Sequence, residues 1–127
     1  MQAPREHADL VSLIPWIDQH TSGLSLPADE RHLLAIGCLD VTLEHQAAIA
    51  LLHANELPGS TLALLRIRTE SLVRGLWLLH CASKDDLQKF KCGSLKKAFR
   101  EFVSEFEAKM EQSPVSTPAS RRGRGTP

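Results

Sequence analysis

The sequence predicts an all-α protein, a helical bundle built on a long antiparallel helical hairpin, with a shorter amphipathic helix toward the carboxyl terminus. Two long stretches of apolar residues at helical spacing are separated by a single turn signal, Leu57-Pro58-Gly59. No stretch alternates apolar and polar residues for long enough to indicate a β-strand. The fold class therefore follows from the hydrophobic period and from one interruption in it.

The composition is that of one globular domain with no excess of either charge. Of the 127 residues, 43% are hydrophobic, and 15 basic residues balance 15 acidic ones, so net charge indicates neither nucleic acid nor a membrane surface as a partner. The amino terminus lacks a basic segment followed by an apolar run, and charges interrupt the longest apolar stretches. We therefore expect a cytoplasmic protein without a membrane span.

The three cysteines do not form a metal or disulfide pattern. Cys38, Cys81 and Cys92 are odd in number and contain no Cys-x-x-Cys pair, which is typical of reduced thiols. No paired short spacing of cysteine and histidine is present. We expect no metal and no cofactor.

Three helices are expected before residue 83. The first covers residues 8–20 and contains Pro15, which should kink the helix or delay its start. The second covers residues 27–55 and begins with a proline, a favoured first-turn residue. Ser60 is expected to cap the third helix, which continues to about residue 82 and is apolar on nearly every face. Such a helix is expected in the middle of a bundle.

Two shorter helices are expected after it. Ser83 and Asp86 match a capping box that opens a short helix, and Gly93 is expected to close it. Ser94 is then expected to begin a final amphipathic helix. Its apolar stripe consists of Leu95, Phe99, Phe102, Phe106 and Met110.

One domain is expected over residues 1–112. Residues 113–127 are dominated by proline, serine, arginine and glycine and cannot bury enough apolar surface to offset their ordering entropy, so we expect this segment to be disordered. The two tryptophans, Trp16 and Trp77, are expected to pack in the core.

Charged residues recur inside the two long apolar helices. When the chain doubles back near residue 57, facing residues have numbers that sum to about 114, which brings Asp40 level with Arg74 and Glu44 level with Glu70. Arg66 extends the series by one turn. Because the surrounding residues are apolar, these side chains are expected to be partly buried and bonded to one another.

This ladder of charges has two interpretations. It is either a structural network that fixes the register of the hairpin, or a functional site. The residues alone do not separate the two. His45 and Gln46 follow Glu44 directly and can join the ladder by hydrogen bonding; the alternative for both is a surface or core-lining role.

Arg74 and His80 form an Arg-x5-His pattern of the kind used by metal-independent ribonucleases of the HEPN superfamily. Histidine exchanges protons near neutral pH, and arginine stabilises negative charge on phosphate. Residues six apart on a helix point about 120° away from each other, so a second subunit or element would have to complete a catalytic site. The alternative is a helix-end His80 that packs or meets solvent.

Two segments resemble a known family. The first is Leu39-Asp40-Val-Thr-Leu-Glu44-His45-Gln-Ala-Ala-Ile49. The second is Ala63-Leu-Leu-Arg66 together with Glu70-Ser-Leu-Val-Arg74-Gly-Leu-Trp77-Leu78. They are similar to an uncharacterised family of bacterial helical proteins, a domain of unknown function that is distantly similar to HEPN-type proteins of toxin–antitoxin and phage-defence systems. The resemblance covers about residues 25–110. The positions that match its signature are Asp40, Glu44, His45, Arg66, Glu70 and Arg74.

The chain departs from that pattern in two places. Where the family tends to have a proline or apolar residue and then an aromatic one, this chain has Ile67-Arg68-Thr69, which adds a charge beside the ladder. Family members also continue into further helices with another histidine, where this chain has its Pro/Ser/Arg/Gly segment. Uncovered helix faces would then need a partner, so the resemblance favours self-association.

These observations favour a non-catalytic helical interaction module, part of a bacterial toxin–antitoxin or phage-defence system, with a second copy or another helical protein as partner. The alternative is a HEPN-like ribonuclease or RNA-binding protein with Arg74 and His80 at a composite site on a dimer interface. A third hypothesis is a small-molecule sensor with the ladder lining a pocket.

Overall fold

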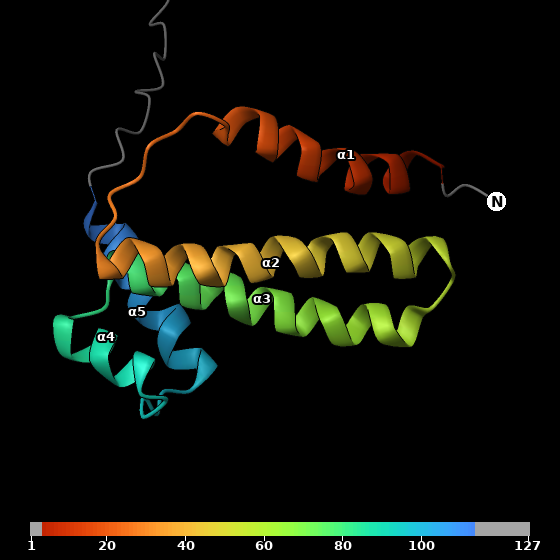
Figure 1. The fold of residues 1–127 in the computed structure, drawn as a ribbon. Helices are drawn as coiled ribbons and strands as arrows, with labels where there is room; N and C mark the ends of the chain where they lie inside the picture. The colour runs from red at the N-terminus through yellow and green to blue at the C-terminus, as the bar shows by residue number, and fades with distance from the viewer. Residues whose placement is uncertain (1–3, 114–127) are drawn as a thin grey trace, which may run out of the picture.

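The structure, a computed structural model, describes residues 4–113, and within that range it contains helices and no strand (Figure 1). The helices are α1 (Pro4–Thr21), α2 (Glu30–Ala54), α3 (Pro58–His80), α4 (Lys84–Lys91) and α5 (Phe99–Gln112). The all-α class and the long helical hairpin, α2 with α3, are therefore confirmed. Residues 114–127, nearly all of the segment expected to be disordered, lie outside the described residues.

The hairpin is defined by local signals at both ends of α2. The side chain of Asp29 accepts a hydrogen bond from the backbone N–H of His32 and so caps the first turn. After α2, Glu56 adopts a positive φ of 56°, and Pro58 begins α3. The predicted start of the third helix at Ser60 is wrong because Pro58 occupies the first turn, where a missing N–H removes no intrahelical hydrogen bond.

α2 and α3 approach each other closely at Gly75. A Cβ atom on this residue would lie 3.2 Å from the Cβ of Cys38, 3.3 Å from the carbonyl oxygen of Ala35 and 3.3 Å from Cδ2 of Leu39. These distances are tighter than ordinary van der Waals contacts. Glycine therefore permits the helices to pack backbone against backbone at this level.

Polar contacts hold the start of α2 to the end of α3 and to α4. The Arg31 guanidinium donates from Nη1 to the carbonyl oxygen of Leu78 at 2.7 Å, which satisfies a carbonyl in the last turn of α3 that has no intrahelical partner. Lys91, at the end of α4, forms an ion pair with Glu30. We call this end of the hairpin, which lies opposite the turn between α2 and α3, the closed end because α4 and these polar contacts cover it.

The hydrophobic core lies at the closed end, where α4 and α5 pack (Figure 1). Trp77 is 1% exposed and Leu78 is fully buried. Its buried residues are Ala35, Trp77, Leu78, Ala82, Leu87 and Phe102. The prediction that the third helix lies in the middle of a bundle holds only near its carboxyl-terminal end, where Gly75, Trp77 and Leu78 are buried. Leu62, Ile67 and Leu72 are exposed.

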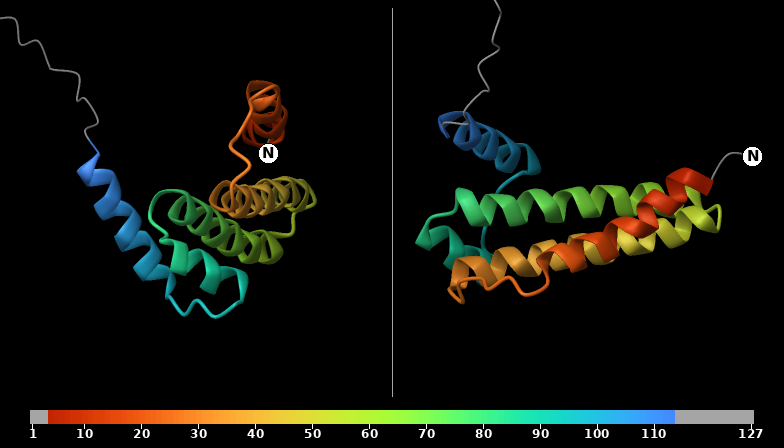
Figure 2. Two further views of the ribbon diagram at one scale, coloured as in Figure 1. Left: turned by 60° about the vertical axis from the view of Figure 1, so that its left-hand side comes forward. Right: turned by 90° about the horizontal axis from the view of Figure 1, so that it is seen from above.

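α1 packs on the opposite side of α2 from α3 (Figures 1 and 2). The helix continues through Pro15 and begins earlier than predicted. Trp16 is 56% exposed and stacks on His20, with ring centroids 4.0 Å apart, so its predicted place in the core is wrong. Within the described residues α2 is the one helix with the length and composition to cross a membrane, a test that core helices also pass.

The region after α3 follows one prediction and departs from another. Ser83 and Asp86 exchange both hydrogen bonds of a capping box, and Gly93 ends α4 with a φ of 68°, as predicted. α5 begins at Phe99 and not at Ser94. The intervening loop is irregular because Leu95 turns in to pack against the core.

Replacing Asp86 with asparagine is expected to lower the free energy of unfolding by about 1 kcal/mol near neutral pH, the usual size of a capping contribution. The hydrogen bond from the backbone N–H of Ser83 lowers the pKa of Asp86. The contribution of Asp86 is therefore complete above its ordinary pKa and is lost as the pH falls through the lowered folded-state pKa. Urea unfolding of both proteins should show their difference shrinking in acid; a difference that stays constant would contradict this role.

Candidate functional site

The predicted ladder of charges is not a buried network. Asp40, Glu44, Arg66 and Arg74 are exposed, and Glu70 is half-buried. The ion pair found among them joins Arg66 Nε to Glu70 Oε1 at 3.2 Å along one face of α3, and the Arg66 side chain is 83% exposed. Within residues 4–113 no ion pair links α2 to α3, so the prediction of burial and cross-helix pairing is wrong.

The predicted pairing is wrong because it placed Asp40 and Glu44 on the side of α2 that faces α3. Thr42 and Gln46 are buried, and Glu44 stands between them in sequence. Residues two apart on an α-helix point about 200° away from each other, so Glu44 faces away from α3. Asp40 stands in the same relation to Thr42 and borders a groove against α1 beside Pro15.

Arg74 also differs from its predicted surroundings. Its neighbour across the hairpin is Cys38: burial raises the pKa of the Cys38 thiol, and the positive charge of Arg74 acts against that rise. Asp40, two residues further along α2, points to the other side. The two groups expected to pair therefore lie on different faces of the hairpin.

The polar contact that does cross the hairpin joins Arg68 to Gln46. Nη1 of Arg68 donates to Oε1 of Gln46, and Nε2 of Gln46 is buried without a hydrogen-bond partner among the described residues. The two residue numbers sum to 114, which agrees with the predicted register. The sequence indicates that Gln46 can hydrogen-bond within the ladder and that Arg68 is an extra charge beside it, but the prediction did not pair the two residues.

The candidate histidines remain apart from Arg74. His80 is exposed, and its ring centroid lies 6.0 Å from that of Phe106 on α5. Arg74 borders a hollow on another face of α3. His45 is half-buried on α2. Arg74 and His80 are therefore not brought together within one chain. This separation was expected from their six-residue spacing.

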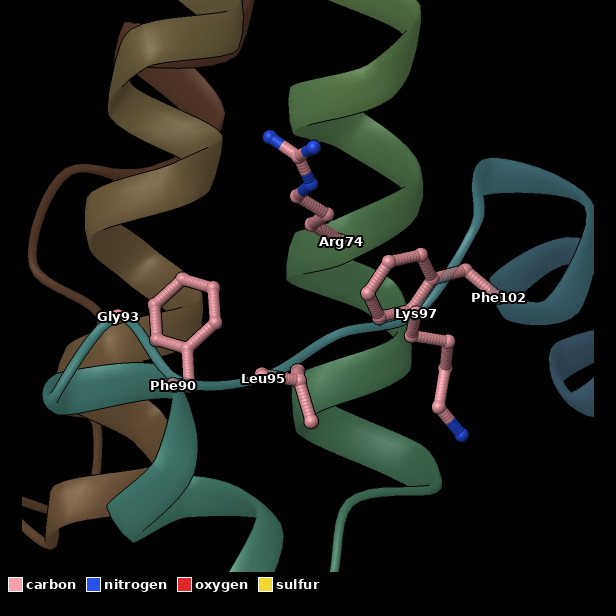
Figure 3. Close-up of a pocket in the computed structure, with 6 residues that line it drawn as sticks. All are labelled: Arg74, Phe90, Gly93, Leu95, Lys97 and Phe102. Atoms are coloured by element: carbon pink, nitrogen blue, oxygen red, sulfur yellow. The ribbon is translucent and has the colours of Figure 1, made fainter.

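The hollow beside Arg74 has a volume of about 160 Å³ and is built from three elements (Figure 3). α3 contributes Arg74, α4 and the loop that follows it contribute most of the walls, and α5 contributes Phe102. Figure 3 shows Arg74 on one side of the hollow and the Lys97 amine pointing away from it. The lining residues are Arg74, Phe90, Gly93, Leu95, Lys97 and Phe102.

A polar cluster behind the hollow ties the loop to α3 and α5. Nε1 of Trp77 donates to Oε2 of Glu105 at 2.7 Å. Nζ of Lys97 binds both carboxylate oxygens of Glu105, at 2.7 Å and 2.6 Å, and lies 5.0 Å from the Trp77 ring centroid. Sequence reasoning missed this cluster because its members are far apart in the chain and follow no helical spacing.

Within the described residues, no group of three or more histidine, cysteine, aspartate or glutamate side chains is placed to hold a metal ion. This hollow offers a ligand the Arg74 side chain together with the aromatic rings of Phe90 and Phe102. In Figure 3 the Arg74 guanidinium points away from these rings, so it would turn toward a bound anion. This arrangement is suited to binding an anion that carries an apolar group.

Comparison with known families decides the classification of the chain. The model of a family of unknown function, DUF6988, matches residues 39–118, which is 80 of the 127 residues. The chain belongs to this family. The DUF6988 region begins within α2 and includes α3, α4 and α5, and it leaves out α1. No curated protein and no solved structure matches the chain significantly.

Replacing Arg68 with leucine is expected to lower the free energy of unfolding by about 1 to 3 kcal/mol, because the buried amide of Gln46 would lose its partner. Leucine at both Arg68 and Gln46 should restore most of that loss, since no buried polar group is then left unsatisfied. The matched control is Arg66→Leu on the exposed face of α3, which should change stability by no more than about 0.5 kcal/mol. Urea unfolding measures all four proteins; equal losses for Arg66→Leu and Arg68→Leu would contradict the assignment.

Proposed function

We propose that this DUF6988 chain is a non-catalytic helical interaction module that associates with a second copy of itself. The contact surface is the half of the α2–α3 hairpin next to its turn, here called the open half. The supporting observation is the exposure of large apolar side chains there. Leu51 on α2 and Leu62 on α3 are each 66% exposed. α4 and α5 pack at the other end of the hairpin (Figure 1) and leave this half of α3 without a second covering helix.

Four leucines and Thr69 on α3 follow the spacing of a helix-packing stripe. Residues 62, 65, 69, 72 and 76 are separated alternately by three and four positions, the spacing with which one helix packs against another in a coiled coil. Leu62 and Leu72 are exposed, whereas Leu65 and Leu76 are half-buried. A stripe of this kind is stabilised when a partner helix covers it.

The charges of the ladder favour a second copy as that partner. Asp40 and Glu44 are exposed on α2, and Arg66 is exposed on α3. In a two-fold dimer, contacts occur twice, so α2 of each copy can meet α3 of the other. Glu44 of one chain would then oppose Arg66 of the next, which is the electrostatic complementarity typical of specific interfaces.

The resemblance to helical proteins of defence systems extends this proposal to a biological setting. A module that folds as a hairpin and assembles through its open half suits an antitoxin or an assembly partner in a bacterial toxin–antitoxin or phage-defence system. The resemblance supports this setting, and the exposed side chains support the assembly surface.

Charge reversal tests the dimer. Glu44→Arg and Arg66→Glu should each raise the dimer dissociation constant at least tenfold, which corresponds to about 1.4 kcal/mol, because like charges would then oppose each other across the interface. The combined variant should recover the affinity of the original chain. Sedimentation equilibrium over a range of concentrations measures all of these proteins.

The matched control for charge reversal is Glu107→Arg, at an exposed position on α5 outside the proposed interface. It should leave the dissociation constant unchanged. A chain that stays monomeric at millimolar concentration, or single variants that associate as well as the original chain, would overturn the proposal.

The second candidate function is a HEPN-like ribonuclease or RNA-binding protein. It is favoured by the exposed guanidinium of Arg74 at the edge of a hollow, which forms no ion pair with another described side chain. If the chain is an interaction module, the purified protein should leave RNA intact without added metal. An enzyme that uses Arg74 and His80 should cleave RNA under the same conditions. Gel analysis of RNA incubated with the chain decides between them. RNA cleavage that is lost in both Arg74→Ala and His80→Ala, with the dimer retained, would establish the ribonuclease.

A further inference from the structure

We propose that the hollow beside Arg74 is a binding site for a small aromatic anion, a single planar ring that carries one carboxylate or phosphate group. This site is separate from the proposed dimer surface, because it lies at the closed end of the hairpin among α3, α4 and α5. The anionic group would bind Arg74, and the ring would lie against Phe90, Leu95 and Phe102.

Arg74 supplies the charge that selects an anion. It forms no ion pair with any carboxylate whose side chain the structure describes, and its neighbour across the hairpin is the thiol of Cys38. Burial raises the pKa of Cys38, so the thiol stays protonated at neutral pH and does not neutralise the guanidinium. The planar fork of arginine donors matches the two oxygens of a carboxylate or a phosphate.

Lys97 contributes its alkyl stem and not its charge. Its amine is bound to both carboxylate oxygens of Glu105 and lies over the Trp77 ring, and in Figure 3 it points away from Arg74. The lysine charge is therefore compensated outside the hollow. Among the lining residues, Arg74 is left as the cation that an incoming anion would meet.

Three of the lining side chains are apolar and are held in place by the core. Phe102 is 3% exposed and belongs to the core, and Phe90 and Leu95 pack against it. The volume of about 160 Å³ is close to that of an engineered apolar cavity of roughly 150 Å³ that accepts benzene. A single ring therefore fits beside these side chains, and the Arg74 guanidinium, which points away from the rings in Figure 3, would turn toward the anionic group.

Trp77 provides a reporter of binding. It touches Phe102, with ring centroids 4.9 Å apart, and lies under the Lys97 amine. The other tryptophan, Trp16, is exposed on α1 and can be replaced by phenylalanine. In the full chain with Trp16→Phe, a ligand that contacts Phe102 should change the fluorescence of Trp77.

The experiment titrates that protein with benzoate and with phenyl phosphate, and it measures both Trp77 fluorescence and heat of binding. At least one of these probes should bind at least tenfold more tightly than benzamide, which has the ring without the charge, and than inorganic phosphate, which has the charge without the ring. The tighter probe distinguishes a carboxylate ligand from a phosphate ester. Equal affinity for benzamide, or tighter binding of inorganic phosphate, would overturn the proposal.

Two arginine variants show whether the probe occupies this hollow. Arg74→Gln should weaken binding at least tenfold, and Arg74→Lys, which keeps the charge but loses the planar fork, should weaken it less. The matched control is Arg100→Gln, since Arg100 is exposed on α5 and two residues from Phe102, about 200° around the helix. Retained binding in Arg74→Gln, or equal loss in Arg100→Gln, would overturn the assignment. Sedimentation of the same samples reports the dimer separately, so either proposal can fail without the other.

Discussion

The structure depends on the close packing of α2 against α3 at Gly75. Because no side chain separates the two backbones there, the helices lie near enough for short polar contacts along their length. Arg31 reaches the last turn of α3, and Arg68 reaches Gln46. The same approach buries Trp77 and Leu78 against Ala35, and α4 and α5 then complete the core on that foundation. A larger residue at this position would weaken all of these contacts together.

Local features of the fold could be predicted from the sequence. The hydrophobic period and the single turn at Pro58 were sufficient for the hairpin, and the Ser83–Asp86 capping box was identified because each hydrogen bond spans three residues. Helix boundaries were less accessible. Ser60 is a good cap in isolation, but Pro58 starts the helix first. Leu95 continues an apolar period, but burial against the core draws it out of the helix.

The contacts at the candidate site could be predicted only in part. The level at which residues of two helices face each other follows from counting along the chain, and the contact between Gln46 and Arg68 agrees with it. Rotation about each helix depends on what covers its other sides, and α1, α4 and α5 decide that. Asp40 consequently faces α1 and Arg74 faces the α4–α5 region. The hollow combines residues from positions 74 to 102, and no local pattern connects them.

α1 lies outside the DUF6988 region and packs mainly against one helix of the hairpin. Its sequence is therefore under few constraints from the core around Trp77, whose residues come from α2, α3, α4, α5 and Ala82. Related chains can then differ in their amino-terminal helix, in length or in chemistry, while they keep the same hairpin. Variation among relatives should accordingly gather at this end of the polypeptide, and an amino-terminal helix suited to one cellular role can be exchanged for another during evolution.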